Sequence, residues 1–188
     1  MHTSPLASLH RLTTAAIVGL AAVLLAGSAA DADVTITAEG AEQGGAARVQ
    51  LTVENERRGA FTTTVRVELP PETPIAEVYP MTVPDWAPKI ITREVAGSLP
   101  GIHSSGLTTA TSAVIWTRAA DAPTPPAVET LYLEMGPLPH VDQLVFTVVQ
   151  TYSDGTVHRW RGPAPSASAG GGGAAAAGQG TVVTLARP

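Results

Sequence analysis

Cysteine is absent from the 188 residues, and this absence limits the chemistry that the chain can carry. Without thiols the protein has no disulfide, no thiolate metal site and no cysteine nucleophile. A metal site would have to use histidine, carboxylates, backbone nitrogen or a free terminal amine. The fold must therefore be stabilised by its core alone.

Charged residues are also scarce, at 14% of the chain, and the formal net charge is −5. No run of lysine or arginine suggests a protein that binds nucleic acid or anionic lipid.

Catalytic motifs are missing as well, because there is no G-x-S-x-G, no S-x-x-K and no phosphate-binding loop. Ser104 and Ser105 follow His103, but adjacency in sequence does not make a catalytic triad. We therefore expect a protein that is not an enzyme.

Only one long apolar run is present, at residues 15–26. Its length matches the hydrophobic region of a signal peptide, about 7–15 residues, whereas a membrane-spanning helix needs about 20. Ala30-Asp31-Ala32 follows as an A-x-A cleavage signal, so we expect residues 1–32 to be a signal peptide. The exported chain would begin at Asp33, and cleavage after Ala30 is the competing choice. We expect a periplasmic or secreted protein whose mature chain has no membrane span.

Residues 33–188 have the pattern of short β-strands. Leu131, Leu133 and Met135 would share one face of a strand, with Tyr132 and Glu134 on the other. Similar alternating or β-branched segments occur at residues 34–37, 49–53, 62–69, 89–95, 113–117, 130–135, 144–152, 157–161 and 182–185. No stretch has a convincing 3.6-residue period. The pattern predicts one all-β domain, an antiparallel immunoglobulin-like or cupredoxin-like β-sandwich of eight to ten short strands.

Two connections between these strands have a clear composition. Asp154-Gly155 supplies the residue types of a tight hairpin turn between the strands at 144–152 and 157–161. Residues 163–180 are of low complexity, rich in glycine and alanine, and we expect a flexible loop there before the last strand. Residues 33–188 would thus form a single domain with one low-complexity loop.

A set of short motifs is spread over nearly the whole of residues 33–188. The upstream motifs are Val53-x-Asn55-Glu56, Leu69-Pro70, Thr73-Pro74-Ile75, Val83-Pro84-x-Trp86 and Ile115-Trp116-Thr117. The downstream motifs are Gly136-Pro137-Leu138-Pro139, Leu144-Val145-Phe146, Gln150-Thr151-Tyr152-Ser153-Asp154-Gly155-Thr156 and Arg159-Trp160. Together they resemble the YcnI-like copper-binding family, and the segment QTYSDGT with the following RW is their most specific part.

The resemblance implies an exported β-sandwich that binds Cu(II), encoded beside genes of copper uptake. In that family the mature chain begins with a histidine, whose amine and imidazole both chelate the copper. A glutamate completes the coordination and a tryptophan lies against the metal. By position, the glutamate falls on Glu56, the tryptophan on Trp160 and the histidine on Asp33. Copper would be the ligand, and a membrane copper-transport protein would be the partner that receives it.

Asp33 departs from the family's pattern. An amine and an aspartate carboxylate can close a chelate ring on Cu(II), but replacing imidazole by carboxylate weakens binding and favours harder ions. The competing interpretation is that the chain has lost the copper site and serves as a metal-free interaction or scaffold module. In that case Glu56 is a solvated carboxylate and Trp160 a core residue.

His158 is a candidate substitute for the missing imidazole. It stands two residues before Trp160, so that both side chains would share one face of a strand, and imidazole is a favoured copper ligand. The competing interpretation is an exposed histidine on an edge strand. His103 and His140 lie in expected loops without the spacing of a metal motif, and we expect both to be surface residues.

Overall fold

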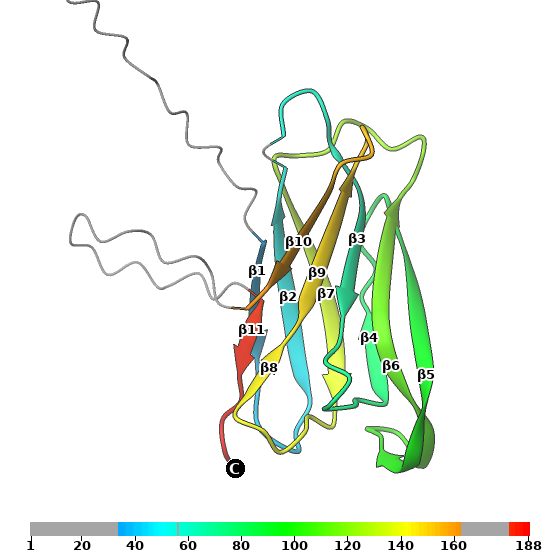
Figure 1. The fold of residues 1–188 in the computed structure, drawn as a ribbon, viewed down its shortest axis with the longest axis vertical. Helices are drawn as coiled ribbons and strands as arrows, with labels where there is room; N and C mark the ends of the chain where they lie inside the picture. The colour runs from blue at the N-terminus through cyan, green and yellow to red at the C-terminus, as the bar shows by residue number, and fades with distance from the viewer. Residues whose placement is uncertain (1–33, 56, 163–180) are drawn as a thin grey trace, which may run out of the picture.

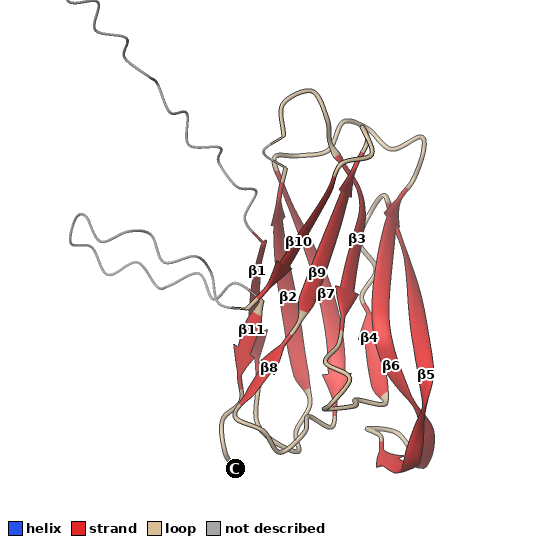
Figure 2. Ribbon diagram, viewed as in Figure 1, coloured by secondary structure: helices blue, strands red, loops and turns tan. Residues whose placement is uncertain are grey.

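The computed structural model describes residues 34–55, 57–162 and 181–188, which form strands joined by loops and turns (Figures 1 and 2). The strands are β1 (Val34–Glu39), β2 (Ala47–Glu54), β3 (Thr62–Glu68), β4 (Glu77–Pro80), β5 (Trp86–Pro100), β6 (Ser105–Arg118), β7 (Val128–Gly136), β8 (Gln143–Val145), β9 (Thr147–Tyr152), β10 (Val157–Arg161) and β11 (Val182–Thr184). Across these three ranges no helix suited to crossing a membrane is found.

Two antiparallel sheets stack face to face. One has the strand order β1-β2-β7-β4 and the other the order β10-β9-β3-β6-β5, while β11 pairs with β8 in a short ribbon (Figure 1). In β2 and β7, for example, alternate residues are buried, as the sequence pattern predicts. The core combines side chains from both inner faces, including Val34, Leu51, Leu131, Val67, Trp116 and Phe146. The predicted all-β antiparallel sandwich is confirmed.

Strand β4 was not among the predicted segments. It is only four residues long, ends in Pro80 and begins with Glu77, so it offers neither the length nor the β-branched composition that marks a strand in sequence. Its place at the edge of the four-stranded sheet explains why a terminal proline is tolerated there. The described residues thus form eleven strands, where we expected eight to ten.

Strands β5 and β6 are longer than expected, with 15 and 14 residues. Only the parts near residues 89–95 and 113–117 show the composition of a strand. Nearest the tip, residues 96–100 and 105–109 are exposed or only partly buried, so the alternation that indicates a half-buried strand is missing there. The loop at the tip of this hairpin reaches β4, where it shapes the outer surface described below.

The segment 144–152, predicted as one strand, divides at Phe146. The first part, β8, pairs with β11, and the second part, β9, pairs with β3 and β10. Phe146 is fully buried, and its N–H donates to the carbonyl of Thr181 at 2.9 Å. In the sequence the two parts look like one continuous strand, because each alternates with period two. The division arises from a change of partner, which no local pattern records.

The expected signal peptide, residues 1–32, and the low-complexity segment, residues 163–180, lie outside the described residues, and both stay predictions.

Candidate metal site

Asp33 and Glu56, the two ligands that the resemblance places on this chain, lie outside the described residues. Their described neighbours can be located. Val34, which follows Asp33, opens β1 and pairs with Val53 of β2. Asn55, which precedes Glu56, follows directly on β2 and donates its N–H to the carbonyl of Ala127 at 2.7 Å. The described chain next to both predicted ligands therefore lies at one end of the four-stranded sheet.

Gln150 connects this end of β2 to the opposite sheet through hydrogen bonds. Its side chain is fully buried in β9, and its Nε2 donates to the carbonyl of Glu54 at 3.1 Å and to Oγ1 of Thr62 at 2.6 Å. Its Oε1 has no hydrogen-bond partner among the described residues. A buried acceptor without a partner loses the hydration that it had in the unfolded chain, so a donor or a cation placed there would stabilise the protein.

His158 and Trp160 lie on β10, which pairs with β9. His158 is opposite Gln150 and Trp160 is opposite Val148. Directly opposed residues of an antiparallel pair point to the same face, and Gln150 and Val148 are both fully buried. His158 and Trp160 therefore share one face of β10, as their two-residue spacing predicts, and that face is the inner face of the sandwich. The residues beside them on the strand are exposed.

The ring of His158 is held between two larger aromatic rings. Its centroid is 5.4 Å from that of Tyr152 and 5.7 Å from that of Trp160, with interplanar angles of 72° and 54°. Trp160 is half-buried and packs against the core. His158 thus packs against both rings and keeps partial access to solvent.

The described residues contain no group of three or more histidine or carboxylate side chains arranged to hold a metal ion. His158 lies on the strand paired with β9, whose Gln150 contacts the end of β2 near the described neighbours of Asp33 and Glu56. A complete site at this end would need Asp33 and Glu56 in addition. The aromatic ring of Trp160 could attract a cation through its face but would not act as a donor ligand.

The other two histidines of the described chain lie elsewhere. His140 is exposed in the loop after Pro139. His103 has a ring that is 71% exposed, but its Nδ1 lies 3.1 Å from Oε2 of Glu77. Sequence reasoning missed this contact, because it joins residues 26 positions apart through the folding back of the β5–β6 hairpin. No composition or spacing signals such a pair.

The carboxylate of Glu77 accepts several hydrogen bonds from the hairpin tip. The N–H groups of Ile102 and His103 donate to it at 2.7 and 3.1 Å, and Oγ of Ser104 donates at 3.3 Å. Burial raises the pKa of this carboxyl, but the hydrogen bonds from His103 and Ile102 outweigh burial and hold the pKa below its ordinary value. The charged carboxylate therefore fixes the hairpin tip on β4.

Comparison with known proteins gives a family and a fold. The family model described as "Domain of unknown function (DUF1775)" matches residues 33–176. The chain is similar to a solved structure from Nocardia farcinica, described as an uncharacterized protein with an immunoglobulin-like fold. The identity is 28%, the TM-score is 0.59, and the match covers 82% of this chain and 98% of that one. This likeness shows that the two sheets form an immunoglobulin-like sandwich.

A second solved structure is a cohesin module from a Clostridium perfringens family 33 glycoside hydrolase. It is 12% identical, with a TM-score of 0.45, and the match covers 84% of this chain and 98% of that one. No curated protein matches the chain.

Proposed function

We propose that this chain, which belongs to the DUF1775 family, is an extracytoplasmic protein of the YcnI-like type that binds Cu(II) and hands it on at the cell envelope. One observation supports this most directly. The described neighbours of both predicted ligands, Val34 and Asn55, lie at the same end of the sandwich, and Gln150 links that end to the strand pair that carries His158.

The proposed donors are of the kinds that Cu(II) accepts. The amine and carboxylate of Asp33 would form a chelate, Glu56 would add an oxygen, and His158 would add an imidazole nitrogen. Cu(II) favours such tetragonal sets of nitrogen and oxygen donors. The half-buried ring of Trp160 would cover one side of the ion and limit its access to water.

Gln150 provides independent support for a polar occupant at this end. Its Oε1 is buried and has no partner among the described residues, although its Nε2 donates two hydrogen bonds. An ammonium group or a metal-bound water near Oε1 would satisfy this acceptor. An apolar end to the sandwich would instead favour an apolar side chain at position 150, because an unsatisfied buried amide costs roughly 1–3 kcal/mol.

A protein that delivers copper must also release it. His158 lies on the edge strand of its sheet and keeps partial solvent access, so a partner can approach the site without unfolding of the core. We propose that the recipient is a membrane copper-transport protein.

Titration of the purified exported chain with Cu(II) near pH 7, followed by EPR, tests the proposal. We expect nitrogen hyperfine couplings from an imidazole in the wild type. These couplings should vanish in His158→Ala and persist in His140→Ala, which removes an exposed histidine from a loop and serves as the matched control. Glu56→Gln should weaken binding without removing the couplings.

Two results would contradict the proposal at different levels. If His158→Ala keeps the imidazole couplings, another histidine binds the metal and the proposed ligand set is wrong. If the wild-type chain binds no copper, the copper site has been lost and the sandwich is a metal-free interaction module.

A further inference from the structure

The outer face of the four-stranded sheet carries two aligned rows of polar and aromatic side chains. In one row Thr37, Gln50 and Tyr132 are register partners on β1, β2 and β7. In the next row Glu39, Arg48, Glu134 and Tyr79 are partners on β1, β2, β7 and β4. We call these seven residues the tyrosine face. Because the residues between them point into the core, the whole set points outward.

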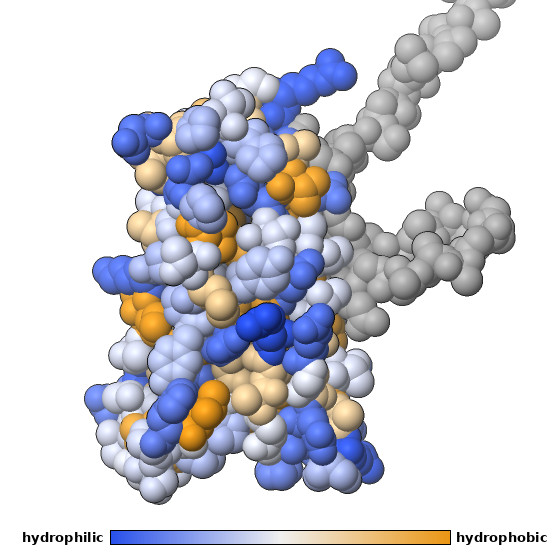
Figure 3. Space-filling model, turned by 180° about the vertical axis from the view of Figure 1, so that it is seen from behind, coloured by the Kyte–Doolittle hydropathy of each residue, from blue (hydrophilic) through white to orange (hydrophobic). Residues whose placement is uncertain are grey.

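Two adjoining hollows mark this face. The larger, of about 490 Å³, is lined by Glu39, Arg48, Glu134 and Tyr79 and is walled by Ile102 and His103 from the tip of the β5–β6 hairpin. The smaller, of about 220 Å³, shares Glu39 and Arg48 with it and extends to Tyr132. Figure 3 shows the molecule from this side, where hydrophilic side chains prevail and the hydrophobic patches are separate.

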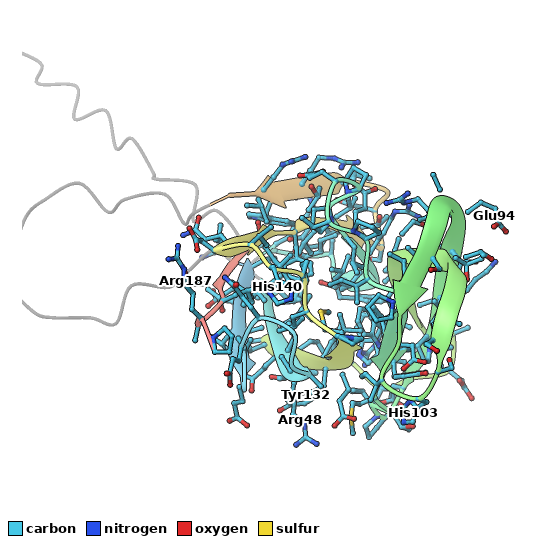
Figure 4. The ribbon with its side chains drawn as sticks, turned by 90° about the horizontal axis from the view of Figure 1, so that it is seen from below. Arg48, Glu94, His103, Tyr132, His140 and Arg187 are labelled. Atoms are coloured by element: carbon cyan, nitrogen blue, oxygen red, sulfur yellow. The ribbon has the colours of Figure 1, made fainter. Side chains whose placement is uncertain are left out.

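The two tyrosines provide exposed aromatic surface at the hollows. Tyr79 is 42% exposed, and its ring and the ring of His103 form a T-shaped pair with a centroid distance of 5.9 Å and an angle of 73°. Tyr132 is half-buried on the neighbouring strand and points outward beside Arg48 (Figure 4). The positions of Tyr79 and Tyr132 are diagonal across adjacent strands, a relationship that separates residues by about 7–8 Å.

The charges on the tyrosine face largely neutralise one another. Arg48 lies between Glu39 and Glu134 in its row, and its Nη2 donates to Oε1 of Glu134 at 2.8 Å. This leaves an excess of one negative charge and no unpaired cation in the two rows. A phosphate, a nucleic acid or an acidic polymer is therefore a poor occupant. The polar rows likewise disfavour an apolar helix, which needs a hydrophobic groove.

We propose that the tyrosine face binds a neutral polysaccharide. A pyranose ring presents apolar C–H groups on its faces and hydroxyls at its rim. The C–H face would stack on Tyr79 or Tyr132, while vicinal hydroxyls would pair with the carboxylates and with the guanidinium of Arg48, whose hydrogen bonds are charge-assisted. The diagonal placement of the two tyrosines suits sugar units of one extended chain.

This inference goes beyond copper handling and does not depend on it. The tyrosine face is on the outer side of its sheet, whereas His158 and Trp160 point to the inner side of the other sheet. The larger hollow also lies at the end of β1 that is marked by Glu39, away from Val34.

Retention on insoluble cellulose, chitin and β-mannan tests the proposal, with the exported chain and EDTA present to remove any metal. We expect retention on at least one of the three, competed by the matching soluble oligosaccharide. Tyr79→Ala and Tyr132→Ala should each weaken the apparent affinity about tenfold, and the double variant should abolish retention. Phe61→Ala is the matched control, because Phe61 is 41% exposed beside the β9–β10 hairpin.

Circular dichroism and thermal unfolding would show whether the variants fold. Tyr79→Phe and Tyr132→Phe provide a second check, because each variant keeps the aromatic ring and should retain most of the affinity. The proposal is overturned if none of the three polysaccharides retains the wild-type chain. It is equally overturned if the double alanine variant is retained like the wild type, or if only an acidic polymer such as heparin binds.

Discussion

Arg118 and Glu129 form an ion pair that joins the two sheets. Nη1 of Arg118 on β6 donates to Oε1 of Glu129 on β7 at 2.8 Å, and the side chains are only 5% and 11% exposed. The guanidinium also donates to the carbonyl of Pro123 at 2.8 Å and lies 5.6 Å from the ring centroid of Trp86. Each buried charge therefore has a partner, which is the condition under which such a pair is tolerated.

Breaking this pair should strongly destabilise the sandwich. Glu129→Ala leaves the guanidinium of Arg118 buried without its counter-charge, and we expect the free energy of unfolding to fall by about 3–5 kcal/mol. Urea denaturation followed by tryptophan fluorescence measures this change. The matched control is Asp142→Ala, which removes the pair with Arg187 whose side chains are 72% and 77% exposed. That change should cost at most about 1 kcal/mol, and equal losses for the two variants would contradict the prediction.

Under the proposed function, replacing Asp33 with histidine should strengthen Cu(II) binding, because the change would place an imidazole beside a terminal amine on that residue. The measurement is a competitive Cu(II) titration of the exported chain, after its first residue has been verified by intact mass. Asp33→Asn is the control, since it removes the carboxylate without supplying a nitrogen ligand and should weaken binding. If Asp33→His brings no gain, the proposed copper site lacks more than one ligand.

Asp154 should make the fold sensitive to acid. The N–H of Thr156 and then the guanidinium of Arg57 lower the pKa of Asp154 to about 2. Because the pKa of this group is lower in the folded chain than its unfolded value of about 3.9, the stabilisation is complete above that value. It is lost as the pH falls from about 4 through 2.

Urea midpoints measured between pH 6 and pH 2 test this dependence. Asp154→Asn should reduce the loss of stability below about pH 4, since the amide has no charge to lose. Arg57→Gln should reduce it only in part, because the N–H of Thr156 still binds the carboxylate. A wild-type profile that Asp154→Asn leaves unchanged would show that other carboxylates cause the acid sensitivity.

Gly101→Ala should loosen the tip of the β5–β6 hairpin. A Cβ at this position would come within 2.6 Å of Oε1 of Glu77 and within 2.7 Å of the carbonyl oxygen of Ser104. We expect a loss of about 1–3 kcal/mol, the usual cost of overpacking, with faster amide hydrogen exchange at Ile102 and His103. Ser104→Ala is the milder comparison, because it removes one hydrogen bond worth about 0.5–1.5 kcal/mol.

The sequence predicts the sandwich well because its alternating residues face a single core. Leu131, Leu133 and Met135 are all fully buried as expected, and the Asp154-Gly155 turn joins β9 to β10. The division at Phe146 and the short strand β4 were not predictable, since each depends on which strand lies alongside. Contacts between distant positions decide these features, and a local pattern does not record them.

The candidate sites, like the fold, were predictable from the sequence only in part. Two-residue spacing was enough to place His158 and Trp160 on one face, because strand geometry alone determines it. The Glu77–His103 contact and the tyrosine face were not foreseen. They arise from the order of strands in the sheet, which brings β4 beside β7 and the tip of the β5–β6 hairpin over β4.

Gly162 and Thr181, which flank the low-complexity segment, are hydrogen-bonded to each other. The N–H of Thr181 donates to the carbonyl of Gly162 at 2.9 Å, and the N–H of Gly162 donates to Oγ1 of Thr181 at 2.9 Å. The cost of closing a loop grows by only about 0.6 kcal/mol for each doubling of its length. A fluorescent protein or an affinity tag inserted between these two anchors should therefore leave the sandwich folded, which offers a place to follow the protein in living cells without altering either terminus.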